Sequence, residues 1–197
     1  MPEEPTVTYA ERSVEAFLSD VASPRVAPSA GATTALTGAL AASLCEMVCI
    51  HTSERETSER LADARSELHD RRERLVSLAD ADGTAVDEVQ TAFEADSDDD
   101  HEQAALRTAT DIPVQIAEAA RDVADCAVVA ATDGTQNART DAVVGVTLAR
   151  AAVDSAAAIV RDNLALLDDD AFVTETRRRI ERAETDVAAA VTSVTGN

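Results

Sequence analysis

The sequence contains no lysine and no tryptophan, and aromatic residues make up only 2% of its 197 positions. All 17 basic residues are therefore arginines, set against 38 aspartates and glutamates, which gives a net charge of −21. Such a charge repels nucleic acid and anionic lipid, so we expect neither as a partner. The acidic excess and the lack of lysine extend along the whole chain. This pattern favours a cytoplasmic protein of a high-salt organism, where counterions screen the surface, over an ordinary acidic protein.

The scarcity of aromatic residues also restricts the core. Hydrophobic residues make up 45% of the chain, too many for a disordered polymer, so the core must consist of alanine, valine, leucine and isoleucine. Only six glycines and five prolines occur, and an alanine-rich chain with few of either favours helix. A length of 197 residues suits one sizeable domain, and no internal boundary is visible over 1–197.

The three cysteines do not form the pattern of a secreted disulfide framework, so we expect a reducing compartment. Cys45 and Cys49 share a helix face, but His51 points elsewhere and no fourth ligand is evident. We therefore expect small core residues here and no metal site.

No targeting or membrane segment is evident. The first residues, MPEEPTVTYAERS, are acidic and lack an apolar signal region. The apolar run over 35–50 is interrupted by Glu46 and is shorter than the ~20 residues of a membrane span. We expect no contact with a membrane.

Hydrophobic periodicity predicts only helices. Pro113 falls inside one of them and is expected to kink it, and Thr140 is a candidate cap for another. No alternating strand pattern and no repeat occurs, so we predict an all-α, up-and-down bundle of five or six mostly long helices. The expected helices cover about 8–22, 32–52, 53–79 with a continuation over 80–95, 103–131, 140–167 and 168–194, with loops over 96–102 and 132–139.

One stretch, RVAPSAGATTALTGALAA at 25–42, places tiny residues between a proline and an apolar helix. Small residues after Pro28 would let the backbone approach a planar ligand, and the helix start offers free N–H groups for a carboxylate or carbonyl. Gly31 is the residue expected to adopt a left-handed conformation. From the residues alone, a tight turn before a buried helix is the simpler interpretation.

Four stretches of the chain follow one another in a familiar order over 13–175. They are FLSDVASPRVAPSAGATTALTGALAASLCEMV, LADADGTAVDEVQTAF, ATDIPVQIAE and DGTQNARTDAVVGVTLARAAVDSAAAIVRDNL. Together they resemble the cyclodeaminase/cyclohydrolase family, which comprises the folate-active C-terminal half of formiminotransferase-cyclodeaminase and its free-standing relatives.

The resemblance implies an all-α fold that forms homodimers or larger assemblies, with a tetrahydrofolate derivative as substrate and no further cofactor. Members hydrolyse 5,10-methenyltetrahydrofolate to the 10-formyl form, or eliminate ammonia from 5-formiminotetrahydrofolate. A free-standing chain is more often the hydrolase. We therefore expect a methenyltetrahydrofolate cyclohydrolase. The alternatives are a formiminotetrahydrofolate cyclodeaminase and a non-catalytic folate-binding or structural bundle.

The chain departs from the family pattern at several positions. The triple glycine of the family is here Ser29-Ala30-Gly31, and the serine that follows it is Ala32. The Gly-Asn turn is Gly134-Thr135, and the asparagine of an Asn-Val pair is Ile159. Each change removes a polar group or a flexible backbone position, so we expect the changes to affect catalysis rather than the fold.

Two carboxylates match the family motifs, Asp82 and Asp141. Hydrolysis of the cationic methenyl carbon needs a held water and a base that takes its proton. If Asp82 is partly buried, its pKa rises toward that of a useful base, so we assign it as base or water-positioner. Asp141 would open a helix, where the N-terminus favours a negative charge, and we assign it as charge partner. From the residues alone, another interpretation is equally good: Asp82 is exposed to solvent, and Asp141 only supports the cap of its helix.

The candidate substrate-binding residues are Pro28, Gly31, Asn137 and Asn163. Either asparagine side chain would suit the alternating donors and acceptors of a pterin edge. Asn137 is equally suited to a turn, which is the commoner use of asparagine. Asn163 falls inside a predicted helix, where asparagine is a poor helix former, and this makes it the more informative of the two.

Overall fold

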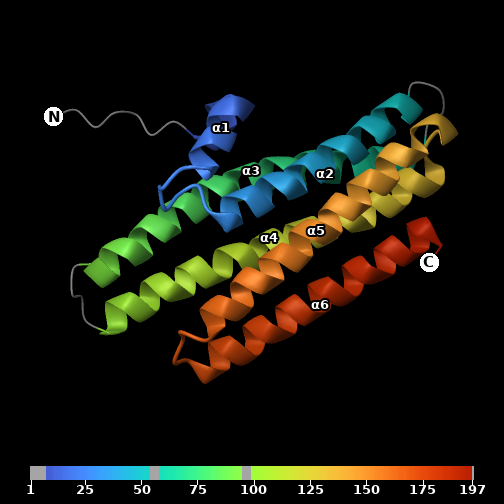
Figure 1. Ribbon diagram of the computed structural model, residues 1–197. Coiled ribbons are helices and arrows are strands. Elements are labelled where there is room, and N and C mark those ends of the chain that lie inside the picture. Colours follow the sequence, from blue (N-terminus) through green and yellow to red (C-terminus); the bar gives the residue numbers. More distant parts are fainter. Residues whose placement is uncertain (1–7, 54–57, 95–98, 197) are drawn as a thin grey trace.

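A computed structural model describes residues 8–53, 58–94 and 99–196. Within these residues the chain is helical and contains no strand, and its long helices run up and down beside one another (Figure 1). The predicted all-α bundle is therefore confirmed. The elements are η1 (Tyr9–Glu11), α1 (Val14–Val21), α2 (Ala30–Ser53), α3 (Glu59–Glu94), α4 (Asp99–Asp133), η2 (Gln136–Ala138), α5 (Arg139–Leu164) and α6 (Asp170–Thr195).

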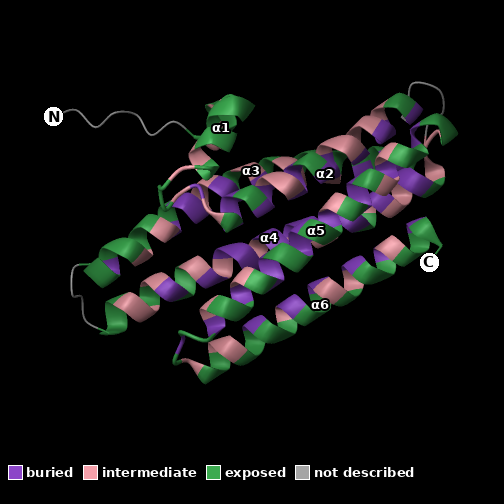
Figure 2. Cartoon of the chain, in the orientation of Figure 1, coloured by how far each residue is buried: buried purple, intermediate pink, exposed green. Residues whose placement is uncertain are grey.

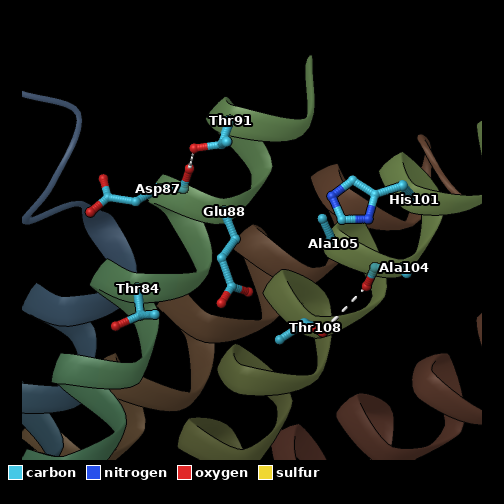
Figure 3. A pocket seen from close by; sticks show the side chains of 8 residues that line it. All are labelled: Thr84, Asp87, Glu88, Thr91, His101, Ala104, Ala105 and Thr108. Atoms are coloured by element: carbon cyan, nitrogen blue, oxygen red, sulfur yellow. Dashed lines mark hydrogen bonds between the residues drawn. The ribbon is translucent and has the colours of Figure 1, made fainter. Parts of the chain in front are cut away.

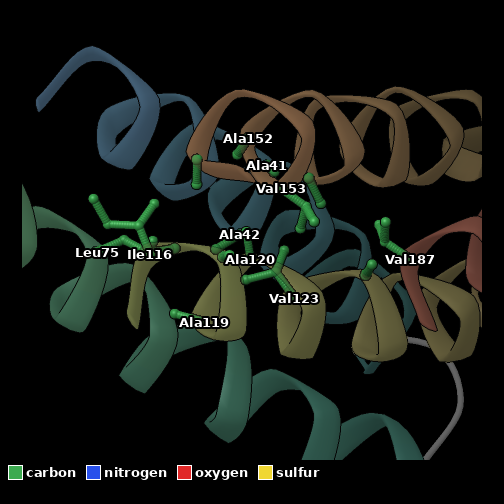
Figure 4. Close-up of a cluster of buried hydrophobic side chains, with 14 of the residues drawn as sticks. Ala41, Ala42, Leu75, Ile116, Ala119, Ala120, Val123, Ala152, Val153 and Val187 are labelled. Carbon is green, nitrogen blue, oxygen red and sulfur yellow. The ribbon is translucent and has the colours of Figure 1, made fainter. Parts of the chain in front are cut away.

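The core is built from small side chains, as the scarcity of aromatics requires. Figure 4 shows alanines and valines of α2, α4 and α5 meeting at the centre of the bundle. At one point α2 and α5 approach so closely that there is no room for a side chain on α5. A Cβ on Gly145 of α5 would lie 2.3 Å from Cys45 Sγ of α2. Small residues thus let the long helices pack at short range, which compensates for the missing large side chains.

Most predicted helices are confirmed, with different boundaries. The charged segment and its continuation form one helix, α3, which runs unbroken past Asp82 and buries Leu61, Leu68 and Leu75 along one seam. The acidic loop expected over 96–102 is wrong from residue 99 onward, because α4 begins at Asp99, where acidic side chains suit a helix N-terminus. Residues 96–98 lie outside the described part of the chain.

The helix caps correct one prediction. Thr140 does not cap α5, because the N-cap position falls on Ala138, whose side chain makes no capping hydrogen bond. Asp169 caps α6, and its carboxylate accepts hydrogen bonds from the backbone N–H groups of Ala171 and Phe172. The first predicted helix is shorter than expected and begins at Val14, after the separate turn η1.

Two described helical stretches, Ala30–Thr52 and Gln136–Leu164, are long and apolar enough to cross a membrane by length and composition. Both exceed the apolar run noted over 35–50. In the bundle, 56% and 44% of their most apolar windows are buried against other helices. Figure 2 shows exposed and half-exposed residues alternating with buried ones along both helices.

A hydrogen bond ties the start of α5 to the C-terminal end of α2. The backbone N–H of Thr135 donates to Thr52 Oγ at 2.9 Å, and the same hydroxyl donates to the Val48 carbonyl at 2.8 Å. Because α5 then runs back along α2, its first turn lies at the opposite end of the bundle from the first turn of α2 (Figure 1).

Candidate active site

Asp82 forms the most distinctive polar contact in the described core. Its side chain leaves α3 and is only 5% exposed. Its Oδ2 accepts a hydrogen bond from the Ser29 hydroxyl at 2.8 Å and another from the Ala32 backbone N–H at 2.8 Å. Ala32 lies in the first turn of α2, whose N–H groups have no partner within the helix. Asp82 therefore caps α2 from the neighbouring helix, and this N–H is bound by protein rather than offered to a ligand.

Gly31 is needed at this contact for a reason that the sequence did not suggest. The expected left-handed conformation is wrong, because Gly31 lies within α2 and the only described glycine with positive φ is Gly196. A Cβ on Gly31 would instead lie 1.9 Å from Asp82 Oδ1. The missing side chain lets the carboxylate reach the helix start. Pro28 is buried directly before this turn.

The surroundings of Asp82 fit a base better than a solvated carboxylate. Burial raises the pKa of Asp82 above its ordinary value of 3.8, whereas the hydrogen bonds from Ser29 and Ala32 act in the opposite direction. Burial is the larger influence. The interpretation of Asp82 as a solvated residue is therefore wrong, although its capping contact gives it a structural task as well.

The segment before α2 covers this part of α3. The Tyr9 backbone N–H donates to Asp80 Oδ1 at 2.7 Å, and the Tyr9 hydroxyl lies 2.7 Å from the position of a Cβ on Gly83. Neither Tyr9 nor Ser29 was identified from the sequence as a site residue. For Ser29 a signal was available, since a hydroxyl stands directly after Pro28 where the family has glycine.

Asn163 has a structural partner that explains its presence inside a helix. Its side-chain amide donates to the backbone carbonyl of Ala109 at 3.1 Å. That carbonyl lies four residues before Pro113, which has no N–H and leaves it without its helical donor. Asn163 thus supplies from α5 the hydrogen bond that Pro113 removes from α4. No ligand is needed to account for it.

Asp141 and Asn137 lie at the far end of the molecule from Asp82. Both are next to the Thr52–Thr135 contact, with Asn137 exposed in η2 and Asp141 half-buried in the first turn of α5. The stretch of α2 between Ala32 and Thr52 spans about 30 Å at the helical rise of ~1.5 Å per residue. The two predicted carboxylates therefore do not meet within one chain.

Cys45 and Cys49 are buried in the core, and Cys126 is partly buried against it. Burial raises the pKa of Cys45 to about 12 and that of Cys49 to about 11, so both thiols are neutral near pH 7. Among the described residues, no group of three or more histidine, cysteine, aspartate or glutamate side chains is placed to hold a metal ion.

A separate hollow of about 570 Å³ lies between α3 and α4. Figure 3 shows Asp87 and Glu88 on one wall and His101 on the other. None of the predicted site residues lines it.

Comparisons with known proteins agree with this architecture. Residues 13–182 match the family model described as formiminotransferase-cyclodeaminase. A methenyltetrahydrofolate cyclohydrolase of Methylorubrum extorquens is 34% identical over 181 residues, which cover 86% of this chain and 87% of that protein. A formimidoyltransferase-cyclodeaminase of Sus scrofa is 29% identical over 188 residues, or 89% of this chain and 35% of that longer protein. The crystal structure of a formiminotetrahydrofolate cyclodeaminase from Thermotoga maritima shares the fold, with a TM-score of 0.90 at 24% identity over 95% of this chain and 96% of that one. The chain therefore belongs to the formiminotransferase-cyclodeaminase family.

Proposed function

We propose that this protein hydrolyses 5,10-methenyltetrahydrofolate to 10-formyltetrahydrofolate. The Methylorubrum cyclohydrolase supports the proposal, because the similarity covers most of both chains. The observation that carries it is the Asp82 carboxylate, buried and fixed by Ser29 and Ala32 at the start of α2. A carboxylate with a raised pKa in a fixed position suits a general base near neutral pH.

The proposed reaction uses Asp82 as base and no cofactor. The oxygen of a water molecule bonds to the cationic methenyl carbon, and one proton of that water passes to Asp82. The bond from this carbon to N5 then breaks, and the proton moves from Asp82 to N5. The remaining hydroxyl proton leaves to solvent as the formyl C=O forms on N10. A nearby negative charge would stabilise the cationic substrate, but within one chain Asp141 lies at the other end of α2 and is too far from Asp82 to supply it.

A second candidate activity is the cyclodeaminase reaction on 5-formiminotetrahydrofolate. It is favoured by the family model and by the Sus scrofa relative, both of which carry the cyclodeaminase name. The elimination needs a group that protonates the departing ammonia, and protonated Asp82 would serve. A non-catalytic folate-binding bundle remains the alternative in which the altered glycine turn has removed activity.

We also propose the compartment, the oligomeric state and the partners of this protein. We place the protein in the cytoplasm of a high-salt organism, as a homodimer or larger homo-oligomer, without nucleic-acid or membrane partners. The net charge of −21 and the absence of lysine support the salt and partner assignments.

The test is to follow the ultraviolet absorbance of 5,10-methenyltetrahydrofolate with purified protein in molar potassium chloride. The same buffer without protein gives the spontaneous rate, and circular dichroism verifies that the protein is folded. Decay well above the spontaneous rate is expected. No acceleration by folded protein would contradict the hydrolase, and ammonia release from 5-formiminotetrahydrofolate would then identify the cyclodeaminase.

A further inference from the structure

A second hollow, of about 260 Å³, lies between α3 and the segment that precedes α2. We call it the N-terminal hollow. The residues that line it include Asp80, Gly83 and Asp87 on α3 and Tyr9, Arg12 and Arg25 before α2. Gly83 directly follows Asp82, so the hollow lies next to the backbone of the proposed base. Its volume is below the ~300–1,000 Å³ of whole small-molecule pockets, so it suits one ring system of a ligand rather than a complete folate.

Contacts within the chain hold the Tyr9 wall of this hollow in place. The Tyr9 backbone N–H donates to Asp80 Oδ1 at 2.7 Å. The Tyr9 ring meets the Phe17 ring edge-on, with centroids 5.5 Å apart, and the Arg12 guanidinium lies 5.1 Å from its centroid. Burial raises the pKa of the Tyr9 phenol, Arg12 acts in the opposite direction, and the charge of Asp82 raises this pKa further. The phenol is therefore protonated near neutral pH and lies close to Asp82.

The charges around the N-terminal hollow disfavour an anionic ligand. Two aspartates and two arginines line it, and both arginines pair with a third aspartate, Asp20, to which Arg25 donates at 3.1 Å. Three carboxylates against two guanidiniums leave the surroundings with a net negative charge. The carboxylates of a folate's glutamate tail would be repelled here, whereas the cationic methenyl ring system would be attracted.

Asp87 has a carboxylate that is available to a ligand in this hollow. Its side chain is exposed and makes no hydrogen bond or ion pair with any residue that the structure describes. Figure 3 shows it pointing away from α4, toward the N-terminal segment, whereas the neighbouring Glu88 points into the hollow between α3 and α4. On the opposite wall, Arg25 uses one nitrogen, Nη1, for Asp20, and a guanidinium has further N–H donors.

The pterin ring of a folate has a polar edge that matches these two groups. Its N3–H and 2-amino group are neighbouring donors, and the 4-oxo group beside them is an acceptor. A carboxylate only accepts, so it can take both donors at once, and a guanidinium can donate to the oxo group.

We therefore propose that the N-terminal hollow binds the pterin ring of the substrate. Asp87 accepts hydrogen bonds from N3–H and the 2-amino group, and Arg25 donates to the 4-oxo group. The proposal rests on the proposed function for the class of substrate, and it makes Asp87 the residue that selects the ring. Tyr9 and Arg12 precede residues 13–182, which match the family model, so the family match assigns them no role.

The proposal is tested by equilibrium dialysis of 5-formyltetrahydrofolate, a folate without the methenyl bridge, against wild type, Asp87→Asn and Glu88→Gln in molar potassium chloride. Glu88→Gln is the matched control, because both residues are exposed carboxylates at adjacent positions of α3. Asp87→Asn should raise the Kd roughly ten- to a hundredfold, since it removes hydrogen bonds to a charged acceptor. Glu88→Gln should bind as the wild type does. An unchanged Kd in folded Asp87→Asn, or equal weakening in both variants, would overturn the proposal.

Selectivity between two rings tests the role of Asp87 in a way that a structural role would not mimic. Lumazine carries a 2-oxo group where pterin carries the 2-amino group, and both are used as competitors in the dialysis. The wild type should prefer pterin, and Asp87→Asn should lose most of this preference, because an amide can donate to the 2-oxo group. A preference that stays the same in Asp87→Asn would contradict recognition of the ring by this residue. The fragment p-aminobenzoylglutamate lacks the ring, so weaker binding of it to Asp87→Asn would place the tail in the hollow instead.

These measurements separate failure of the proposal from failure of the proposed function. If the wild type hydrolyses the methenyl substrate but Asp87→Asn binds folate normally, the pterin assignment is wrong and the function stands. If Asp87→Asn weakens binding but the wild type hydrolyses nothing, the function is wrong and the pterin assignment stands. A folded wild type that binds no folate would overturn both.

Discussion

At the scale of single residues, the site depends on two hydrogen bonds to one buried carboxylate. Ser29 and the Ala32 N–H both reach Asp82 Oδ2, and both act against the rise in pKa that burial causes. The base is ionised only above this raised pKa. The acid limb of kcat/KM should therefore lie above pH 3.8, the ordinary value for an aspartate.

Replacing Ser29 by alanine should move that acid limb to higher pH. The substitution removes a hydrogen bond that stabilises the ionised form of Asp82, so its pKa should rise further. The measurement is a pH profile of kcat/KM for methenyl hydrolysis. Ser43→Ala is a matched control, because the Ser43 hydroxyl donates to the Ala39 carbonyl on the same helix, away from Asp82. If the acid limb does not move in Ser29→Ala, the group that titrates in the pH profile is not Asp82.

Asp82 also links stability to pH. Because its folded-state pKa is raised, the stability it contributes is fully present below its unfolded pKa. That contribution is lost as the pH rises through the folded-state value. In Asp82→Asn this pH dependence should be missing from urea unfolding curves measured across the acid range. Equal pH dependence in variant and wild type would contradict the raised pKa.

Gly31→Ala should destabilise the protein, because the added Cβ would meet Asp82 Oδ1 at 1.9 Å. Overpacking of this kind typically costs about 1–3 kcal/mol in the free energy of unfolding. Gly38→Ala is the control on the same helix, since its Cβ would lie 3.2 Å from flexible Leu75 methyl groups. Urea unfolding should show a clear loss for Gly31→Ala and a smaller change for Gly38→Ala. Equal effects would mean that the close approach of Asp82 does not matter.

At the scale of the helices, periodicity predicted nearly everything that depends on local sequence. Leu61, Leu68 and Leu75 form a buried seam that repeats every seven residues, a spacing that is visible in the sequence itself. The contact between Ser29 and Asp82 joins residues 53 positions apart, and no local pattern encodes such a pair. Periodicity likewise predicts how long each helix is, but not which helix ends lie side by side. For this reason Asp82 and Asp141 were assigned to one site, although the length of α2 separates them.

The Pro113–Asn163 contact between helices α4 and α5 yields a prediction of its own. Asn163→Ala should leave the Ala109 carbonyl without a donor and cost about 1–3 kcal/mol of unfolding free energy. In a Pro113→Ala background, residue 113 regains its N–H and can bond that carbonyl within the helix. Asn163→Ala should then cost less. A double-mutant cycle by urea unfolding measures the difference, and an identical cost in both backgrounds would contradict the compensation.

At the scale of the whole molecule, the net charge of −21 should make stability depend on salt. Repulsion among the surface carboxylates opposes the compact state, and added ions screen it. The Tm should therefore rise between 0.1 and 2 M potassium chloride, as followed by circular dichroism. Sucrose at matched osmolality is the control for solute exclusion. A Tm that does not rise with potassium chloride, or rises equally with sucrose, would contradict adaptation to high salt.

The central claim is that Asp82 is the base for hydrolysis of 5,10-methenyltetrahydrofolate. The most direct measurement compares the decay of methenyl absorbance for wild type and Asp82→Asn at the same concentration in molar potassium chloride. Their circular dichroism spectra are recorded alongside, so that loss of fold is excluded. The account predicts decay well above the spontaneous rate for the wild type and near the spontaneous rate for the folded variant. A folded Asp82→Asn that hydrolyses the substrate as fast as the wild type would contradict it.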